Sequence, residues 1–354
     1  MRRRVWVNLP ALFKEDNIER EVERISSIGF EELLLLISDG NVTLFDSNVR
    51  SNKPNYRFHS RLEKTIEIVH RMGLKAHAWI VTLKISNEGF VKEHADWYVV
   101  NKMGESSAEK PPYVEDYKWL CPRKPQVIEF TKDFFMEVAS RFDFDGLHFD
   151  YIRLPDIILP KGLRPRYYGV PLEEVYTPRF DFCYCNGCRG LFMSEVGVDP
   201  IKIEYDDPLY QRFFRWRADG VTNLVREVYN AVKSVRSDIE VSAAVFPTPT
   251  IAYKYVFQRW HEWPLDLYDP MIYHKYYEMD VEWIGEAVHE AASMNLPISA
   301  GILLDFMERP EEVYRALQLA VNNGAKGITI FVYPPRNLKA LEWVKNSLNM
   351  LKHY

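Results

Sequence analysis

The sequence lacks any long apolar run. Its 354 residues contain no stretch of about 18 apolar residues, the length that crosses a bilayer, so membrane insertion is not expected. The basic start Met1–Val7 leads directly into a strand-like run, without the apolar segment of about 7–15 residues that a secretory signal contains. The sequence therefore predicts a cytoplasmic protein without a membrane partner.

Clustered positive charge and a glycine-rich phosphate loop are also missing. The net charge is −5 and there is no basic tract, so nucleic acid is not an expected partner, because its binding depends on clustered Lys and Arg. The first strand-like run is followed by Asn8-Leu9-Pro10-Ala11, which is no glycine-rich loop. This argues against a doubly wound open sheet that binds a dinucleotide.

Short apolar blocks alternate with longer amphipathic blocks, the pattern of a parallel α/β sheet. The predicted strands are Arg4–Asn8, Glu32–Ser38, Lys75–Val81, Gly146–Ile152, Ile239–Phe246, Leu267–Tyr273, Ile298–Leu304 and Gly327–Tyr333. The predicted helices are Ile18–Ile28, Arg61–Met72, Gln126–Ser140, Tyr210–Val235, Val281–Met294, Glu311–Asn323 and Leu338–Leu351.

Three of the connections that follow strands are long: Asp39–Ser60, Thr82–Pro125 and Leu154–Pro208. In a (β/α)8 barrel such loops emerge on the C-terminal face, where active sites are built. We therefore predict a single TIM-barrel domain over residues 1–354, with long insertions on the C-terminal face and a rim insertion over residues 156–208.

The fourth predicted strand carries the clearest chemical signal. With a period of two, Gly146, His148 and Asp150 point to one face, while Leu147, Phe149 and Tyr151 point to the other. The apolar set is expected to face the helices and the polar set the barrel interior. Because a carboxylate inside a barrel costs stability unless it is paired or used, Asp150 is a catalytic candidate. It also allows a structural reading, in which Asp150 braces the rim.

The segment Asp145–Pro155, reading D-G-L-H-F-D-Y-I-R-L-P, and the later segment Asp269–His274 resemble a known family. It is the glycosyl-hydrolase-like TIM-barrel family of uncharacterised bacterial proteins. The resemblance extends from Val5 to about Pro334 and implies carbohydrate chemistry at the rim, with the fourth-strand Asp150 as catalytic residue.

The same strand is also similar to the D-G-x-D-x-D-x-E motif of family 18 chitinase-like barrels, but Ile152 stands where their general-acid glutamate would be. A hydrolase would then take its second carboxyl from another strand, since glycoside hydrolysis generally needs two. We predict Asp269 on the sixth strand as the catalytic partner, with Asp305 at the end of the seventh in reserve.

Further polar and aromatic residues are expected around the same mouth. Each of them also allows a structural reading. The predicted substrate-binding residues are Asn8, His77, Trp79, His148, Arg153, Tyr273, His274 and Tyr333.

All four cysteines are Cys121 and the C-x-C-x2-C cluster of Cys183, Cys185 and Cys188. Four thiols suit a closed tetrahedral zinc site, which makes the metal structural. The arrangement resembles that of family 42 beta-galactosidases, barrels in which an upstream cysteine and such a cluster hold zinc. Disulfides and free buried thiols are the alternatives.

The predicted function is a glycosidase that acts on an oligo- or polysaccharide or glycoside, with a carbohydrate as its partner and no organic cofactor. One alternative is a carbohydrate-binding barrel without catalysis. Another is a metal-dependent hydrolase that uses His77, His148 and Asp150 around a catalytic ion. The sugar, the linkage, the stereochemistry and the oligomeric state stay open.

Overall fold

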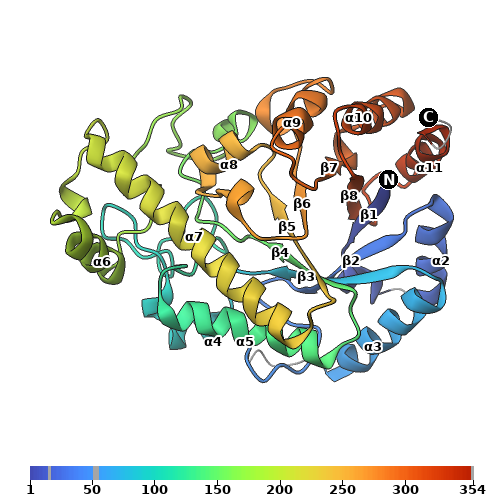
Figure 1. Cartoon of the computed structure of the whole chain (residues 1–354), viewed down its shortest axis with the longest axis horizontal. Coiled ribbons are helices and arrows are strands. Elements are labelled where there is room, and N and C mark those ends of the chain that lie inside the picture. Colours follow the sequence, from blue (N-terminus) through green and yellow to red (C-terminus); the bar gives the residue numbers. More distant parts are fainter. Residues whose placement is uncertain (15–16, 51–55, 352–354) are drawn as a thin grey trace.

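Eight parallel strands form one sheet that curls into a nearly closed barrel in the computed structural model, which describes residues 1–14, 17–50 and 56–351 (Figure 1). The strand order is β6-β5-β4-β3-β2-β1-β8-β7, and the pairs Tyr268–Ile298 and Met271–Gly301 join β6 to β7. The predicted (β/α)8 fold is confirmed. The strands are β1 (Arg2–Val7), β2 (Glu32–Ser38), β3 (Lys75–Val81), β4 (Gly146–Asp150), β5 (Glu240–Val245), β6 (Leu267–Pro270), β7 (Ser299–Leu303) and β8 (Gly327–Tyr333).

A helix follows each strand and covers the outside of the barrel. The prediction missed α8, which has only eight residues and is thus shorter than the amphipathic blocks that reveal the others. The covering helices are α2 (Ile18–Ile28), α3 (Tyr56–Arg71), α5 (Pro125–Arg141), α7 (Pro208–Val235), α8 (Pro249–Val256), α9 (Trp283–Ala292), α10 (Pro310–Asn322) and α11 (Ala340–Leu351).

Local chemistry sets the boundaries of these elements. The run Glu32–Ser38 is almost wholly apolar and buried, as a strand covered on both faces must be. In α2, the Asn17 side chain accepts a hydrogen bond from the amide of Arg20, and Gly29 ends the helix at a φ of 109°. A side chain is rarely tolerated in that left-handed conformation, so glycine makes the stop sharp.

The connections after β3 and β4 are the longest, and each holds a short helix of its own. These helices are α4 (Glu88–Glu93) after β3 and α6 (Asn186–Val196) after β4. A further short helix, α1 (Leu9–Leu12), follows β1. In Figure 1, α7 extends from the region of α6 at the left toward the barrel. Among the described residues, no helix has the length and apolar character of a membrane span.

The part of the barrel interior below the cavity, toward the N-terminal ends of the strands, is polar. Arg4 is fully buried there, and its Nη1 lies 2.5 Å from Oδ2 of Asp269, which is equally buried. Glu32 lies 3.2 Å from Arg4 Nε, and Ser242 accepts a hydrogen bond from Arg4 Nη2. Burial raises the pKa of Asp269, while the charge of Arg4 opposes that rise. The guanidinium thus ties β1, β2, β5 and β6 together.

A small apolar layer lies on this polar group. It consists of Trp6, Leu34, Trp79 and Ala244, with Met271 and Phe331 packed against it. Its two indoles have a polar edge each. Trp6 Nε1 donates a hydrogen bond to His148 in the interior, and Trp79 Nε1 donates one to Asp150. The layer therefore separates the polar interior from the C-terminal end of the barrel.

We predict that Arg4→Met destabilises the protein by about 3–5 kcal/mol, because it leaves the buried charge of Asp269 without its partner. Arg3→Met is the matched control on the same strand, since Arg3 pairs with the half-exposed Glu31 and surface pairs contribute about 0–1 kcal/mol. Urea denaturation measures both. Equal losses would show that the interior ion pair has no special weight.

Candidate active site and cysteine cluster

Asp150 is the last residue of β4, and the strand ends there because the next residue turns the chain. Tyr151 has a φ of 51°, a left-handed conformation, and its amide donates a hydrogen bond of 2.7 Å to Oδ1 of Asp150. The prediction that Tyr151 continues the strand and faces the helices is therefore wrong. Its side chain lines the same cavity as Asp150. Ile152, also outside the strand, is fully buried.

Burial controls the chemistry of Asp150. Its side chain has only 8% of its surface exposed, and loss of solvation raises the pKa of its carboxyl. Trp79 Nε1, at 2.9 Å from Oδ2, and the amide of Tyr151 stabilise the ionised form and oppose that rise. Asp150 is thus an acid that neutral donors hold in place. Its own burial favours retention of its proton.

Above Asp150 lies a cavity of about 400 Å³, which is in the range of small-molecule sites. It stands at the C-terminal end of the barrel, lined by the ends of β2, β3, β4 and β8 and by the long loops. Ten of its twenty lining residues are aromatic, which gives it broad apolar walls. They are Trp79, Tyr113, Tyr117, Tyr151, Tyr167, Phe246, Tyr273, Tyr276, Tyr277 and Phe331.

Two more charged residues line this cavity, and they bind each other. Arg153 Nη1 lies 2.9 Å from Oδ2 of Asp156, and Tyr117 donates a hydrogen bond to the same oxygen. Arg153 also donates to the Tyr117 hydroxyl. Asp156 is therefore the second carboxyl group of the cavity, and it is held in a fixed position by a cation and a phenol.

The other two predicted carboxylates lie elsewhere. Asp269 points inward as predicted, but one layer lower, where it binds Arg4 and Thr329 beneath the apolar layer. Asp305 is exposed on the rim, where it accepts a hydrogen bond from the amide of Arg336. Neither residue lines the cavity.

Of the eight predicted substrate-binding residues, Trp79, Arg153 and Tyr273 line the cavity. Three others serve local structure instead. Asn8 caps α1 through the amide of Ala11, and the Tyr333 hydroxyl donates to Glu21 on the outer helix α2. His274 is buried, with its ring edge-on to Phe306.

His77 and His148 lie in the barrel interior. His77 Nε2 is 3.2 Å from Oε2 of Glu32, and His148 is bound between Trp6 Nε1 and Ser242. Burial holds the pKa of His148 well below its ordinary value, so it stays neutral. Within the described residues these histidines do not converge with Asp150 into a metal-binding group, which gives no support to a metal-dependent hydrolase.

One group of acidic and histidine side chains in the barrel interior could in principle hold a metal ion. It consists of Glu32, His77 and Glu240. Its carboxylates already have cationic partners, since Arg2 pairs with both of them and Arg4 with Glu32. Burial acts to raise the pKa of Glu32, but the adjacent His77, the hydrogen bonds from Arg2 and the charge of Arg4 hold it well below its usual range. These ion pairs indicate a structural cluster.

Among the cavity residues that sequence reasoning missed, Asp156 and Tyr117 are on the loops after β4 and β3. Asp156 carried a weak signal, because it follows Arg153 at a spacing of three in Arg-Leu-Pro-Asp, directly after the strand. Tyr117 carried none, since a loop aromatic has no period that reveals which way it points.

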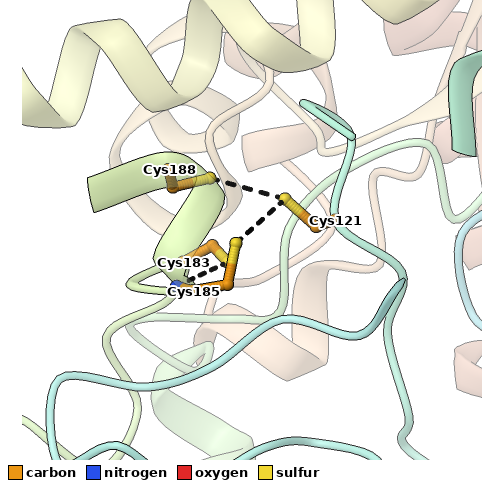
Figure 2. A group of neighbouring side chains, drawn as sticks. All are labelled: Cys121, Cys183, Cys185 and Cys188. Carbon is orange, nitrogen blue, oxygen red and sulfur yellow. Dashed lines mark hydrogen bonds between the residues drawn. The ribbon is translucent and has the colours of Figure 1, made fainter. Parts of the chain in front are cut away.

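The four cysteines come together as predicted, all buried and with their sulfur atoms within 4.8 Å of one another (Figure 2). Cys121 Sγ lies 3.5 Å from Cys188 Sγ and 3.9 Å from Cys185 Sγ. These distances are too long for disulfides, and the thiols are free. They fit a tetrahedron with metal–sulfur bonds of about 2.3 Å, whose edges are about 3.8 Å. The cluster is therefore a possible metal site.

This cluster joins two loops that also build the cavity. Cys121 belongs to the loop between β3 and α5, and the other three precede or begin α6. Close to Cys183, the ring of Phe180 stacks on the cavity residue Tyr113 at 4.8 Å. The Tyr113 hydroxyl donates to the backbone carbonyl of Asp156. The segment that precedes Cys183 thus contacts the charged wall of the cavity through Tyr113.

Comparison with protein families identifies the barrel. Residues 3–304 match the family described as Glycosyl hydrolase-like 10. The chain belongs to this family. The resemblance predicted from Asp145–Pro155 and Asp269–His274 is thereby confirmed at the level of the family. A search among curated proteins found no match.

Solved structures with the same fold include glycosidases. The PgaB (BpsB) glycoside hydrolase domain from Bordetella bronchiseptica is 15% identical with a TM-score of 0.74, and the match covers 98% of each chain. The alpha-L-fucosidase isoenzyme 2 from Paenibacillus thiaminolyticus (14%, TM-score 0.67) is matched over 49% of its length and 99% of this chain. The beta-galactosidase from Halorubrum lacusprofundi (13%, TM-score 0.68) is matched over 58% of its length and 99% of this chain. At these identities the similarity establishes the fold.

We predict that the stability of Asp150→Asn relative to the wild type is higher at pH 7 than at pH 4. Burial makes the folded protein bind this proton more tightly than the unfolded chain, where the pKa is near 3.8. Ionisation above that pH thus costs stability, which the amide avoids. The amide nitrogen cannot accept one of the two hydrogen bonds that the carboxyl oxygens accept, and this loss is the same at both pH values. Urea denaturation at pH 7 and pH 4 measures the difference. A difference between variant and wild type that does not change with pH would contradict this reading of the carboxyl.

Proposed function

We propose that this member of the glycosyl hydrolase-like 10 family is a glycosidase that hydrolyses an O-glycosidic bond of an oligosaccharide, polysaccharide or glycoside in the cavity above Asp150. The observation that carries the proposal is the position of Asp150, a buried acid at the C-terminal end of a barrel strand with its pKa raised. Active sites of TIM-barrel enzymes lie at this end. A buried acid whose pKa is raised binds its proton more tightly than an exposed one, which suits general acid catalysis.

The walls of the cavity support a carbohydrate ligand. Sugar rings have apolar faces formed by C–H groups, and aromatic rings cover such faces well. Trp79 is fixed by its hydrogen bond to Asp150, so its ring is presented in one orientation. A sugar stacked in this cavity would have its polar edge directed at the few polar groups of the lining.

Asp156 is the second carboxyl group in this proposal, in the place that the sequence assigned to Asp269 or Asp305. It lines the same cavity as Asp150, whereas the other two do not. Glycosidases generally divide their chemistry between two carboxyl groups. We assign proton transfer to Asp150, and to Asp156, held by Arg153, the role of the negative charge that stabilises a cationic transition state.

A carbohydrate-binding barrel without catalysis is the second candidate. The observation that favours it is the ion pair between Asp156 and Arg153, since a carboxylate so paired is a weaker base and nucleophile. The two functions differ in what Asp150→Asn changes. In a glycosidase the amide removes turnover but leaves most of the aromatic wall for binding, whereas a binding barrel has no turnover to lose.

For the cysteine cluster we propose structural zinc. Four thiol ligands close the coordination sphere and leave no position for a catalytic water. Cys121 and Cys183 lie on different loops, so a bound ion would fix the two loops to each other. The metal would thus supply stability to the cavity rim and no chemistry to the reaction.

We predict that Asp150→Asn lowers glycoside turnover at least 100-fold while the variant stays folded, because loss of an acid–base group typically costs about 10²–10⁴-fold. The measurement is hydrolysis of a panel of 4-nitrophenyl glycosides and of oligosaccharides by release of reducing ends. Asp305→Asn, on the exposed rim, is the matched control and should keep wild-type turnover.

Turnover at the wild-type rate in Asp150→Asn would remove Asp150 from the mechanism. An equal loss in Asp305→Asn would move the catalytic centre to the rim. Sugar binding without hydrolysis in the wild type would establish the binding barrel in place of the glycosidase.

We predict one zinc ion per chain, retained by Asp150→Asn and lost in Cys183→Ser. Elemental analysis of the purified proteins measures the content. Because a structural ion is linked to folding, Cys183→Ser and treatment with a chelator should both lower the melting temperature. A metal-free wild type with the same melting temperature before and after chelation would exclude the zinc site.

A further inference from the structure

Tyr273 has a hydroxyl group that the fold does not use. The residue follows β6 and has 9% of its surface exposed, and its ring packs against Phe331 at a centroid distance of 5.7 Å. Its hydroxyl oxygen is buried, and among the residues that the structure describes none forms a hydrogen bond with it. An unsatisfied buried polar group is destabilising, so such a group calls for an explanation.

The position of the hydroxyl offers that explanation. Tyr273 lines the cavity together with Asp150, and after burial the charge of Asp150 is the next largest cause that raises the pKa of the phenol. The phenol therefore remains a proton donor at neutral pH. No hydrogen bond joins the phenol to Asp150 among the described residues, and both side chains line the same cavity.

We propose that Tyr273 is a catalytic residue whose hydroxyl donates a hydrogen bond to a sugar hydroxyl that lies between it and Asp150. The inference rests on the proposed carbohydrate function and names the group that the cavity recognises. The phenol is placed to donate, and the carboxyl of Asp150 donates when protonated and accepts when ionised, so a group that can both donate and accept suits this position in either state. A hydroxyl group does both, whereas an amide N–H or a C–H group does not.

Tyr268, five residues earlier in β6, provides the control. It is more deeply buried than Tyr273 but does not line the cavity, and its hydroxyl donates to the backbone carbonyl of Trp263. One tyrosine thus has a hydroxyl that the fold uses, and the other has a hydroxyl that the fold leaves for a ligand. Removal of the oxygen atom by mutation to Phe should affect the two proteins in opposite ways.

The experiment compares wild type, Tyr273→Phe and Tyr268→Phe. The readouts are kcat and KM on the 4-nitrophenyl glycoside that the wild type hydrolyses fastest, and the melting temperature of the free protein. We expect Tyr273→Phe to lose about 10- to 100-fold in kcat/KM, as when one donor to the transition state is removed, with an unchanged or higher melting temperature. Tyr268→Phe should keep its kcat/KM within twofold and melt about 1–3 °C lower.

Two results would overturn the proposal: full activity of Tyr273→Phe, or a loss of melting temperature in Tyr273→Phe equal to that of Tyr268→Phe. If the wild type hydrolyses no glycoside, the glycosidase proposal fails by itself. The same three proteins are then compared in their binding of methyl glycosides by calorimetry. A tenfold weaker affinity in Tyr273→Phe supports the role of its hydroxyl in recognition, and equal affinities refute it.

Discussion

The buried ion pair between Arg4 and Asp269 is the interaction on which the rest of the barrel depends. Both groups are inaccessible to solvent, and either charge alone would be costly in this interior. The pair also fixes the side chains around it. Glu32 and Ser242 bind Arg4, and Thr329 donates a hydrogen bond to Asp269. One guanidinium thus fixes the relative positions of strands that are far apart in the sequence, and the floor of the cavity is built on that arrangement.

The apolar layer above this pair connects the barrel interior to the cavity, because its two indoles form hydrogen bonds on opposite sides of it. Its two indoles face opposite ways, with Trp6 bonded to His148 below and Trp79 bonded to Asp150 above. Asp150 is thereby buried without any direct cationic partner, which is what raises its pKa. For Asp269 in the interior layer, the charge of Arg4 opposes the rise in pKa that burial causes, whereas for Asp150 the hydrogen bonds of neutral donors are the main opposition. The apolar layer thus separates an acid paired with a cation from an acid bonded to neutral donors.

Sequence patterns predicted the fold well and the site only in part. The bounds of β2, β3 and β8 were predicted to the residue, because each is a nearly continuous apolar run, and the inward face of β4 followed from its period of two. The period says nothing of depth, however, so Asp269 was placed at the mouth although its partner Arg4 holds it one layer below. The cavity walls came from loops, where Tyr117 and Asp156 are positioned by tertiary contacts that no local pattern encodes.

The long loops after β3 and β4 supply much of the cavity wall, and they need a restraint that helices and strands do not provide. Tyr113 is held by the stacked ring of Phe180 and by its bond to the backbone of Asp156, and Phe180 lies just before the first clustered cysteine. A rim packed through these aromatic contacts and a floor tied by buried charge restrict the movement of the cavity walls. The buried hydroxyl of Tyr273 has no hydrogen-bond partner among the residues that the structure describes, and such walls do not supply one by a small movement. That constraint is the physical reason to look for its partner in a bound sugar.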